Sequence, residues 1–143
     1  MLRRLVDALA PGGTIFLGDF DGLIPPVPVS VPEPGDADLI TRFVDANWRA
    51  LELHGAYRGW AREAPQELQH CGLIDIASHQ LSQRAGVGSA GHRLLRANVR
   101  MLRSSLLTWM TADELDRLDR ILDDPQTVMF SHSLVFSWGR KEL

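Results

Sequence analysis

Apolar residues recur with a helical period in five parts of the chain. The first runs from Leu2 to Ala10, and Pro11-Gly12-Gly13 then ends it. Four more stretches with this period cover 36–54, 64–70, 94–109 and 112–122. Thr111 and Glu114 precede the last stretch with the spacing of a capping box. The pattern therefore predicts helices in these five segments.

Three other segments have the character of β-strands. Residues 14–20 form a compact apolar run with β-branched and aromatic members, and residues 73–81 form a second, less regular strand. Residues 128–138 alternate strictly, which predicts one long strand. The order of these segments predicts an α/β fold, with a small three-stranded mixed sheet and flanking helices in a single domain over residues 1–143.

Five prolines between Gly22 and Gly35 interrupt this alternation. Proline lacks a backbone N–H and fixes its φ angle, so we expect a proline-rich loop or lid at 22–35. A helical cap is expected to follow at about 36–70, with Asp36 as a helix cap.

Composition narrows the choice of partners. The 143 residues are 45% hydrophobic and 23% charged, with a net charge of −3, so no global attraction to nucleic acid or anionic lipid is expected. Arginines at 93, 96, 100 and 103 are interpreted as the solvated side of a helix. The single Cys71 excludes an intrachain disulfide. With no apolar run of membrane length, these features predict a cytoplasmic protein without a membrane partner.

Three junctions in fixed order carry a resemblance to a known family. They are Leu9–Asp19, with its Pro-Gly-Gly turn, Gln66–Ile76, and Val135–Lys141, which ends in Gly-Arg-Lys. Together they resemble the C-terminal half of a class I S-adenosylmethionine-dependent methyltransferase. The resemblance covers nearly the whole chain. It implies a Rossmann-like arrangement in which the three strands are equivalent to strands 5, 7 and 6 of the family.

The resemblance also implies what the chain lacks. The family binds S-adenosylmethionine with a glycine-rich turn after its first strand and an acidic residue after its second, and the resemblance starts at the helix before the fifth strand. No cofactor-binding residue and no cofactor are therefore assigned to this chain. It is expected to be a truncated or split methyltransferase-like protein that supplies the substrate side and is inactive alone. The open sheet edge implies a partner, either a complementary N-terminal half or a second copy in a homodimer.

Two other classes of function stay open. One is a non-catalytic, self-associating interaction module that uses the exposed sheet edge. The other is a small-molecule binding domain unrelated to methylation, with the proline-rich segment as its lid.

Candidate substrate-binding residues lie in two places, and the catalytic residue is unknown. Asp19 and Asp21 follow a predicted strand, where open α/β sheets place ligand groups, although they could equally cap the turn. His54, Tyr57 and Arg58 form a polar and aromatic group in the expected cap, where they would line a pocket or cover a helix end.

Other motifs are assigned structural roles. Gly86–Gly91 has the spacing of a dinucleotide-binding turn, but Asp113 falls inside a helix start, so a glycine loop is favoured. No third ligand accompanies Asp19 and Asp21, so no metal site is predicted. His132 is interpreted as a hydrogen-bonded core histidine.

Overall fold

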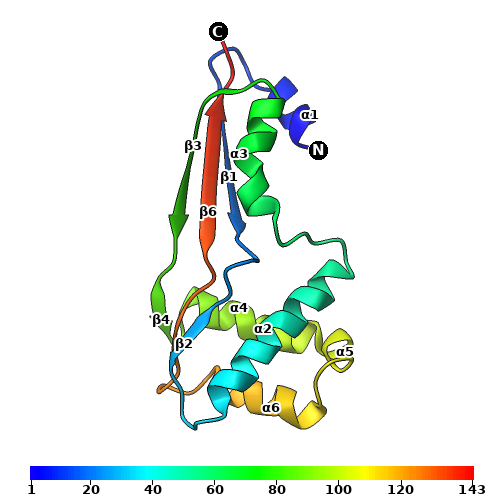
Figure 1. Ribbon diagram of the computed structural model, residues 1–143, viewed down its shortest axis with the longest axis vertical. Helices are drawn as coiled ribbons and strands as arrows, with labels where there is room; N and C mark the ends of the chain where they lie inside the picture. The colour runs from blue at the N-terminus through cyan, green and yellow to red at the C-terminus, as the bar shows by residue number, and fades with distance from the viewer. The chain divides into compact units, whose positions relative to one another are not determined.

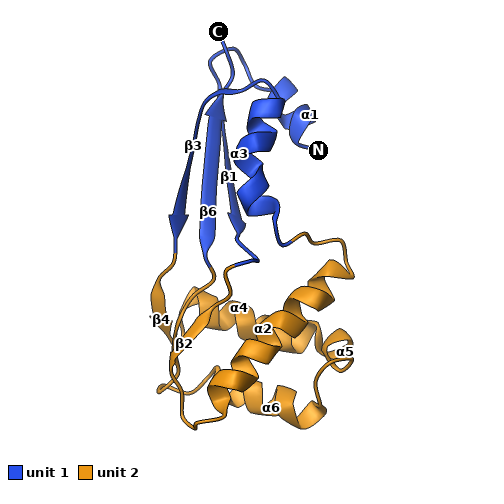
Figure 2. Cartoon of the chain, in the orientation of Figure 1, with its two compact units in different colours: residues 1–23, 58–81, 133–143 blue, residues 24–57, 82–132 orange.

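The protein has a mixed α/β fold with two compact units. The computed structural model describes all residues from 1 to 143, with six helices and two three-stranded antiparallel sheets (Figure 1). Unit 1 contains residues 1–23, 58–81 and 133–143, and unit 2 contains residues 24–57 and 82–132 (Figure 2). Each unit is therefore assembled from chain segments that are distant in sequence.

Unit 1 contains the three strands that the sequence predicts. Its elements are α1 (Leu2–Asp7), β1 (Thr14–Phe20), α3 (Trp60–His70), β3 (Ile74–Leu81) and β6 (Leu134–Arg140). The last strand, β6, lies between β1 and β3 and is antiparallel to both (Figure 1). The expectation of a mixed sheet was wrong in this respect. The strands β1 and β3 run in the same direction, but β6 separates them, so no neighbouring pair is parallel.

The two helices of unit 1 cover one face of its sheet. Val6 of α1, Leu68 of α3 and Leu73 are buried together, with Ile15 and Leu17 of β1 packed against them. Because side chains alternate along a strand, Phe16 lies on the opposite face, where it is 62% exposed.

The C-terminal segment ties the elements of unit 1 together. A Cβ on Gly139 would lie 3.1 Å from Cβ of Leu73, so a larger residue would fit only if its neighbours shifted by a few tenths of an ångström. The Arg140 guanidinium donates to Oδ2 of Asp75 from Nη2 at 2.6 Å and from Nε at 2.9 Å. Nζ of Lys141 donates to the carbonyl oxygens of Val6, Asp7 and Leu9 at 3.3, 3.1 and 2.9 Å. A lysine side chain at the C-terminal end of a helix can donate to the last carbonyl oxygens and interacts favourably with the helix dipole.

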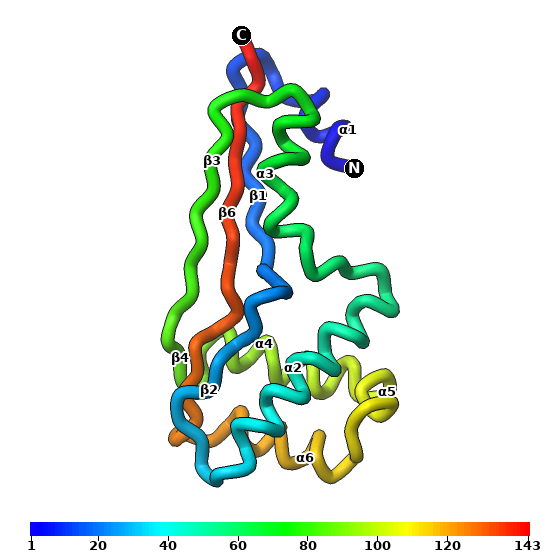
Figure 3. Tube along the Cα trace, viewed as in Figure 1, coloured from blue at the N-terminus to red at the C-terminus, as the bar shows by residue number.

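Unit 2 combines four helices with the second sheet, as the Cα trace in Figure 3 shows. Its elements are β2 (Val27–Ser30), α2 (Asp36–Glu52), β4 (Arg84–Gly86), α4 (Ala90–Met101), α5 (Arg103–Leu106), α6 (Ala112–Ile121) and β5 (Val128–Phe130). The strand β5 lies between β2 and β4 and is antiparallel to both. The core consists of fully buried apolar side chains, among them Ile40, Phe43, Leu95, Leu106, Leu115, Leu118 and Leu122.

Ion pairs join the helices of unit 2. Asp36 is 4% exposed and accepts hydrogen bonds from Nε and Nη2 of Arg117 at 3.1 and 2.9 Å. Arg96 and Arg100 of α4 both donate to Asp119 of α6. Arg100 is exposed, as the sequence indicated, but the cluster also binds a neighbouring helix, since Arg103 pairs with Asp116 of α6 at 2.9 Å.

The capping box at the start of α6 is confirmed. The Glu114 N–H donates to Oγ1 of Thr111 at 3.2 Å, and the Thr111 N–H donates to Oε2 of Glu114 at 2.8 Å. The same carboxylate forms an ion pair with Arg42 at 2.7 Å. The backbone hydrogen bond from Thr111, followed by the bond from Arg42, lowers the pKa of Glu114 below its ordinary value.

Several predicted elements differ from those observed. The long strand at 128–138 is two strands, β5 and β6, which belong to different units. The proline-rich stretch at 22–35 includes the strand β2, whose Pro28 pairs opposite Met129. Proline is tolerated there because β2 is an edge strand. The helix predicted at 94–109 is interrupted at Leu102, and the expected cap at 36–70 is divided, with α2 in unit 2 and α3 in unit 1.

Candidate functional site

The end of β1 holds a buried carboxylate in unit 1. Asp21 is 2% exposed, and its backbone N–H donates to the Ser133 carbonyl oxygen at 2.8 Å. Its Oδ2 accepts a hydrogen bond from Nε of Arg62 at 2.8 Å, and its Oδ1 accepts one from the Leu23 N–H at 3.0 Å. A buried charge needs this kind of pairing, because an isolated carboxylate loses its hydration. Asp21 therefore anchors the chain where it leaves the strand.

Asp19 is the exposed carboxylate of this region. Its Oδ1 accepts a hydrogen bond from the Phe20 N–H at 2.7 Å. In the β1 alternation Asp19 shares a face with Ile15 and Leu17, which is the face that α1 and α3 cover. An exposed carboxylate at a strand end can accept hydrogen bonds from an amine or hydroxyl group of a ligand. Asp19 thus offers a ligand contact, whereas Asp21 is occupied by the fold.

The predicted group around position 57 is divided between the two units. Arg58 belongs to unit 1, where its carbonyl oxygen accepts a hydrogen bond from the Gly22 N–H at 3.1 Å. His54 and Tyr57 belong to unit 2 and are exposed after the end of α2. Of the predicted residues, Asp19, Asp21 and Arg58 therefore belong to unit 1, and His54 and Tyr57 belong to unit 2.

Sequence reasoning missed Arg62 as a member of this site. Arg62 lies in the first turn of α3, and its side chain is 50% exposed while its partner Asp21 is buried. No local spacing connects positions 21 and 62. The available signal was only general: a carboxylate that becomes buried needs a cation or hydrogen-bond donors, and Arg62 lies in the first turn of a predicted helical region.

The glycine motif at 86–91 lies in a setting unlike that of a dinucleotide-binding turn. The preceding strand β4 has three residues and pairs only with the antiparallel β5. Ser89 caps α4 by accepting from the His92 N–H at 3.4 Å, and a Cβ on Gly91 would lie 3.3 Å from Cβ of Ser131. A dinucleotide site uses a parallel βαβ unit, so the geometry favours the glycine loop.

Metal ligands do not gather in the structure. No group of three or more histidine, cysteine, aspartate or glutamate side chains lies where it could hold a metal ion. The longest helices also lack the length and hydropathy that a bilayer crossing requires.

No protein-family model matches the chain, and no curated protein matches it. The assignment of function therefore depends on the sequence motifs and the geometry of this molecule.

Proposed function

We propose that this chain forms the substrate-side part of a class I S-adenosylmethionine-dependent methyltransferase and does not transfer methyl groups alone. The observation that carries the proposal is the strand order β1-β6-β3, in which the last strand is inserted antiparallel between the first and the middle strand. The family arranges its strands 5, 7 and 6 in this order. We therefore propose that β1, β6 and β3 are equivalent to strands 5, 7 and 6 of the Rossmann-like sheet of that family.

The three sequence junctions support the same proposal through their contacts. Lys141, from the third junction, binds the end of α1 directly before the first, and Arg140 pairs with Asp75 of the second. These contacts bring the three junctions together in unit 1, as expected if they belong to one fold.

In the proposed enzyme, S-adenosylmethionine supplies an electrophilic methyl group for an oxygen, nitrogen or carbon nucleophile. Its binding residues would belong to a part of the enzyme outside the 143 residues described here. Asp19, at the end of β1, would bind a hydrogen-bond donor of the acceptor substrate. Holding the nucleophile in line with the methyl group accounts for much of the rate in such reactions.

Calorimetric titration with S-adenosylmethionine and with its demethylated product tests the first part of this proposal. We expect no saturable binding to the purified chain. In a mixture with a polypeptide that carries the cofactor-binding half of a class I methyltransferase, we expect complex formation through the open edge of β1. Binding of the cofactor to the chain alone, or no association with any such half, would count against the proposal.

A self-associating module is the second candidate, and the outer face of the unit 1 sheet favours it. The exposed Phe16 ring stacks on Phe136 and Trp138, with centroid distances of 5.6 and 5.7 Å. The strand β1 is at the edge of the sheet, so both its outer hydrogen-bonding groups and these rings could pair with a second copy.

Sedimentation at several concentrations separates this candidate from a monomeric chain. Phe16→Glu is expected to weaken the dimer. Leu53→Glu, at a position in unit 2 that is similarly exposed at 69%, should leave it unchanged. A concentration-independent monomer would exclude the self-association hypothesis.

A further inference from the structure

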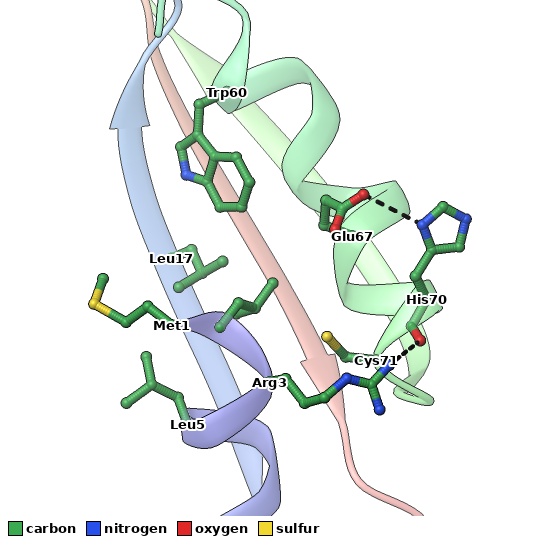
Figure 4. Close-up of a pocket in the computed structure, with 9 residues that line it drawn as sticks. Met1, Arg3, Leu5, Leu17, Trp60, Glu67, His70 and Cys71 are labelled. Atoms are coloured by element: carbon green, nitrogen blue, oxygen red, sulfur yellow. Dashed lines mark hydrogen bonds and ion pairs between the residues drawn. The ribbon is translucent and has the colours of Figure 1, made fainter. Parts of the chain in front are cut away.

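A cavity in unit 1 lies between α1, β1 and α3 (Figure 4). Its volume is about 540 Å³, within the range of roughly 300–1,000 Å³ that small-molecule sites have. Leu2, Leu5, Leu17 and Trp60 contribute apolar surface to its lining. Leu5 is 47% exposed although its helix packs on the sheet, so apolar surface in the cavity is uncovered.

The unpaired charge at this cavity is positive. One Nη of Arg3 donates to the His70 carbonyl oxygen at 3.3 Å, and no acidic side chain pairs with the guanidinium. Glu67 is the acidic side chain in the lining, and it is engaged elsewhere. Its Oε1 lies 3.2 Å from Nδ1 of His70, and Figure 4 shows the carboxylate directed toward that ring. A guanidinium has five N–H donors, so Arg3 retains several for a ligand.

Cys71 also lines the cavity, but the site is not arranged for thiol chemistry. Figure 4 shows the Cys71 sulfur directed toward α1, whereas the His70 ring lies on the other side of the helix end, next to Glu67. The histidine that could take a thiol proton is therefore directed away from the sulfur, and binding rather than catalysis fits the arrangement.

We infer that this cavity binds a small carboxylate with an apolar body. The carboxylate accepts hydrogen bonds from the Arg3 guanidinium, which matches a planar carboxylate well. The apolar body covers Leu5 and lies against Leu17 and Trp60. The C-terminal end of α1 is fixed by Lys141, so this wall of the cavity is held in place before a ligand enters. The inference does not depend on the proposed function.

Octanoate and 1-octanol are matched probes for this site, because they share an apolar chain and differ in the head group. We expect saturable binding of octanoate to the purified chain by NMR chemical-shift titration. Arg3→Gln should weaken octanoate binding by about tenfold or more, because a charge-assisted hydrogen bond is lost, and should leave the weaker octanol binding unchanged. Arg4→Gln, at the neighbouring exposed arginine of α1, is the control and should change neither.

Three results would overturn the inference. The first is no saturable octanoate binding to the folded chain. The second is octanol binding as tight as octanoate binding, which would show an apolar cavity without carboxylate recognition. The third is equal weakening by Arg3→Gln and Arg4→Gln, which would show attraction to net charge alone. Leu5→Gln provides a separate check on the apolar wall, and it should weaken both probes.

Discussion

Acidification from about pH 7.5 to about pH 5 is expected to destabilise unit 2 through His132. This side chain is 5% exposed, and its burial lowers the pKa from 6.5 to about 4. Between these two values the unfolded chain binds a proton that the folded chain does not. The stability that depends on neutral His132 is therefore complete above pH 6.5 and is lost as the pH falls toward 4.

The size of this effect follows from the two pKa values. One pKa unit corresponds to about 1.4 kcal/mol, so the full difference amounts to about 3 kcal/mol, of which about 2 kcal/mol is lost by pH 5. His92 adds to the loss, because burial also lowers its pKa and neither ring nitrogen has a hydrogen-bond partner. Hydrogen bonds lower the pKa of Glu114, chiefly that from the Thr111 backbone, and the pKa of Asp119, chiefly that from Arg96, so the stability that these carboxylates contribute is lost only as the pH falls below their ordinary pKa values.

Urea unfolding at the two pH values measures the effect. The wild type should lose about 2 kcal/mol more than His132→Leu, because His92 is present in both and cancels. His54→Asn, at an exposed histidine, is the control and should behave as the wild type. Equal losses in wild type and His132→Leu would refute the reasoning. An NMR titration of the His132 ring is independent of the variant's folding, and a midpoint near 6.5 would refute it as well.

Two further predictions concern single polar contacts. Lys141→Met should lower the free energy of unfolding by about 1–2 kcal/mol, because three carbonyl oxygens at the end of α1 lose a charged donor. Chemical unfolding measures this loss, and Lys141→Arg should show a smaller loss than Lys141→Met. Asp36→Ala should cost about 1–2 kcal/mol, because two charge-assisted hydrogen bonds from the partly exposed Arg117 are lost while its ion pair with Glu33 remains. Asp38→Ala, at an exposed position of the same helix, should stay within about 0.5 kcal/mol by the same measurement.

The parts of the fold that depend on local pattern were predictable. The strand at 14–20 coincides with β1, and the capping box at Thr111 begins α6 as expected. The order of the strands in unit 1 followed from the family resemblance rather than from periodicity, since no local pattern specifies which strands become neighbours. Of the three expected strands, β6 was the least accurate, because alternation continues across residues 131–133 while the chain passes from one unit to the other.

The candidate site was less predictable than the fold, because its contacts are long-range. Asp21 and Arg62 are separated by 41 positions and meet only because α3 packs on the sheet that β1 forms. The division of His54 and Tyr57 from Arg58 likewise depends on where the chain passes between units, which no residue pattern marks. The strand β2 was not predicted, because the five prolines of this segment favour a loop despite the β-branched residues on either side of Pro28. An edge strand such as β2 tolerates proline.

The residues that carry the family resemblance have mechanical roles in unit 1. Gly139 permits the approach of Leu73, Arg140 pairs with Asp75, and Lys141 binds the end of α1. Substitution of any of these residues is expected to lower the stability of unit 1, so a loss of activity in such a variant would not identify a catalytic role. Because packing and hydrogen bonding explain these residues, they support a proposal about the fold but give no evidence of catalytic activity. Evidence about a ligand has to come from side chains that keep hydrogen-bonding capacity beyond their contacts in the fold, such as Asp19 at the end of β1 and Arg3 at the cavity beside α1.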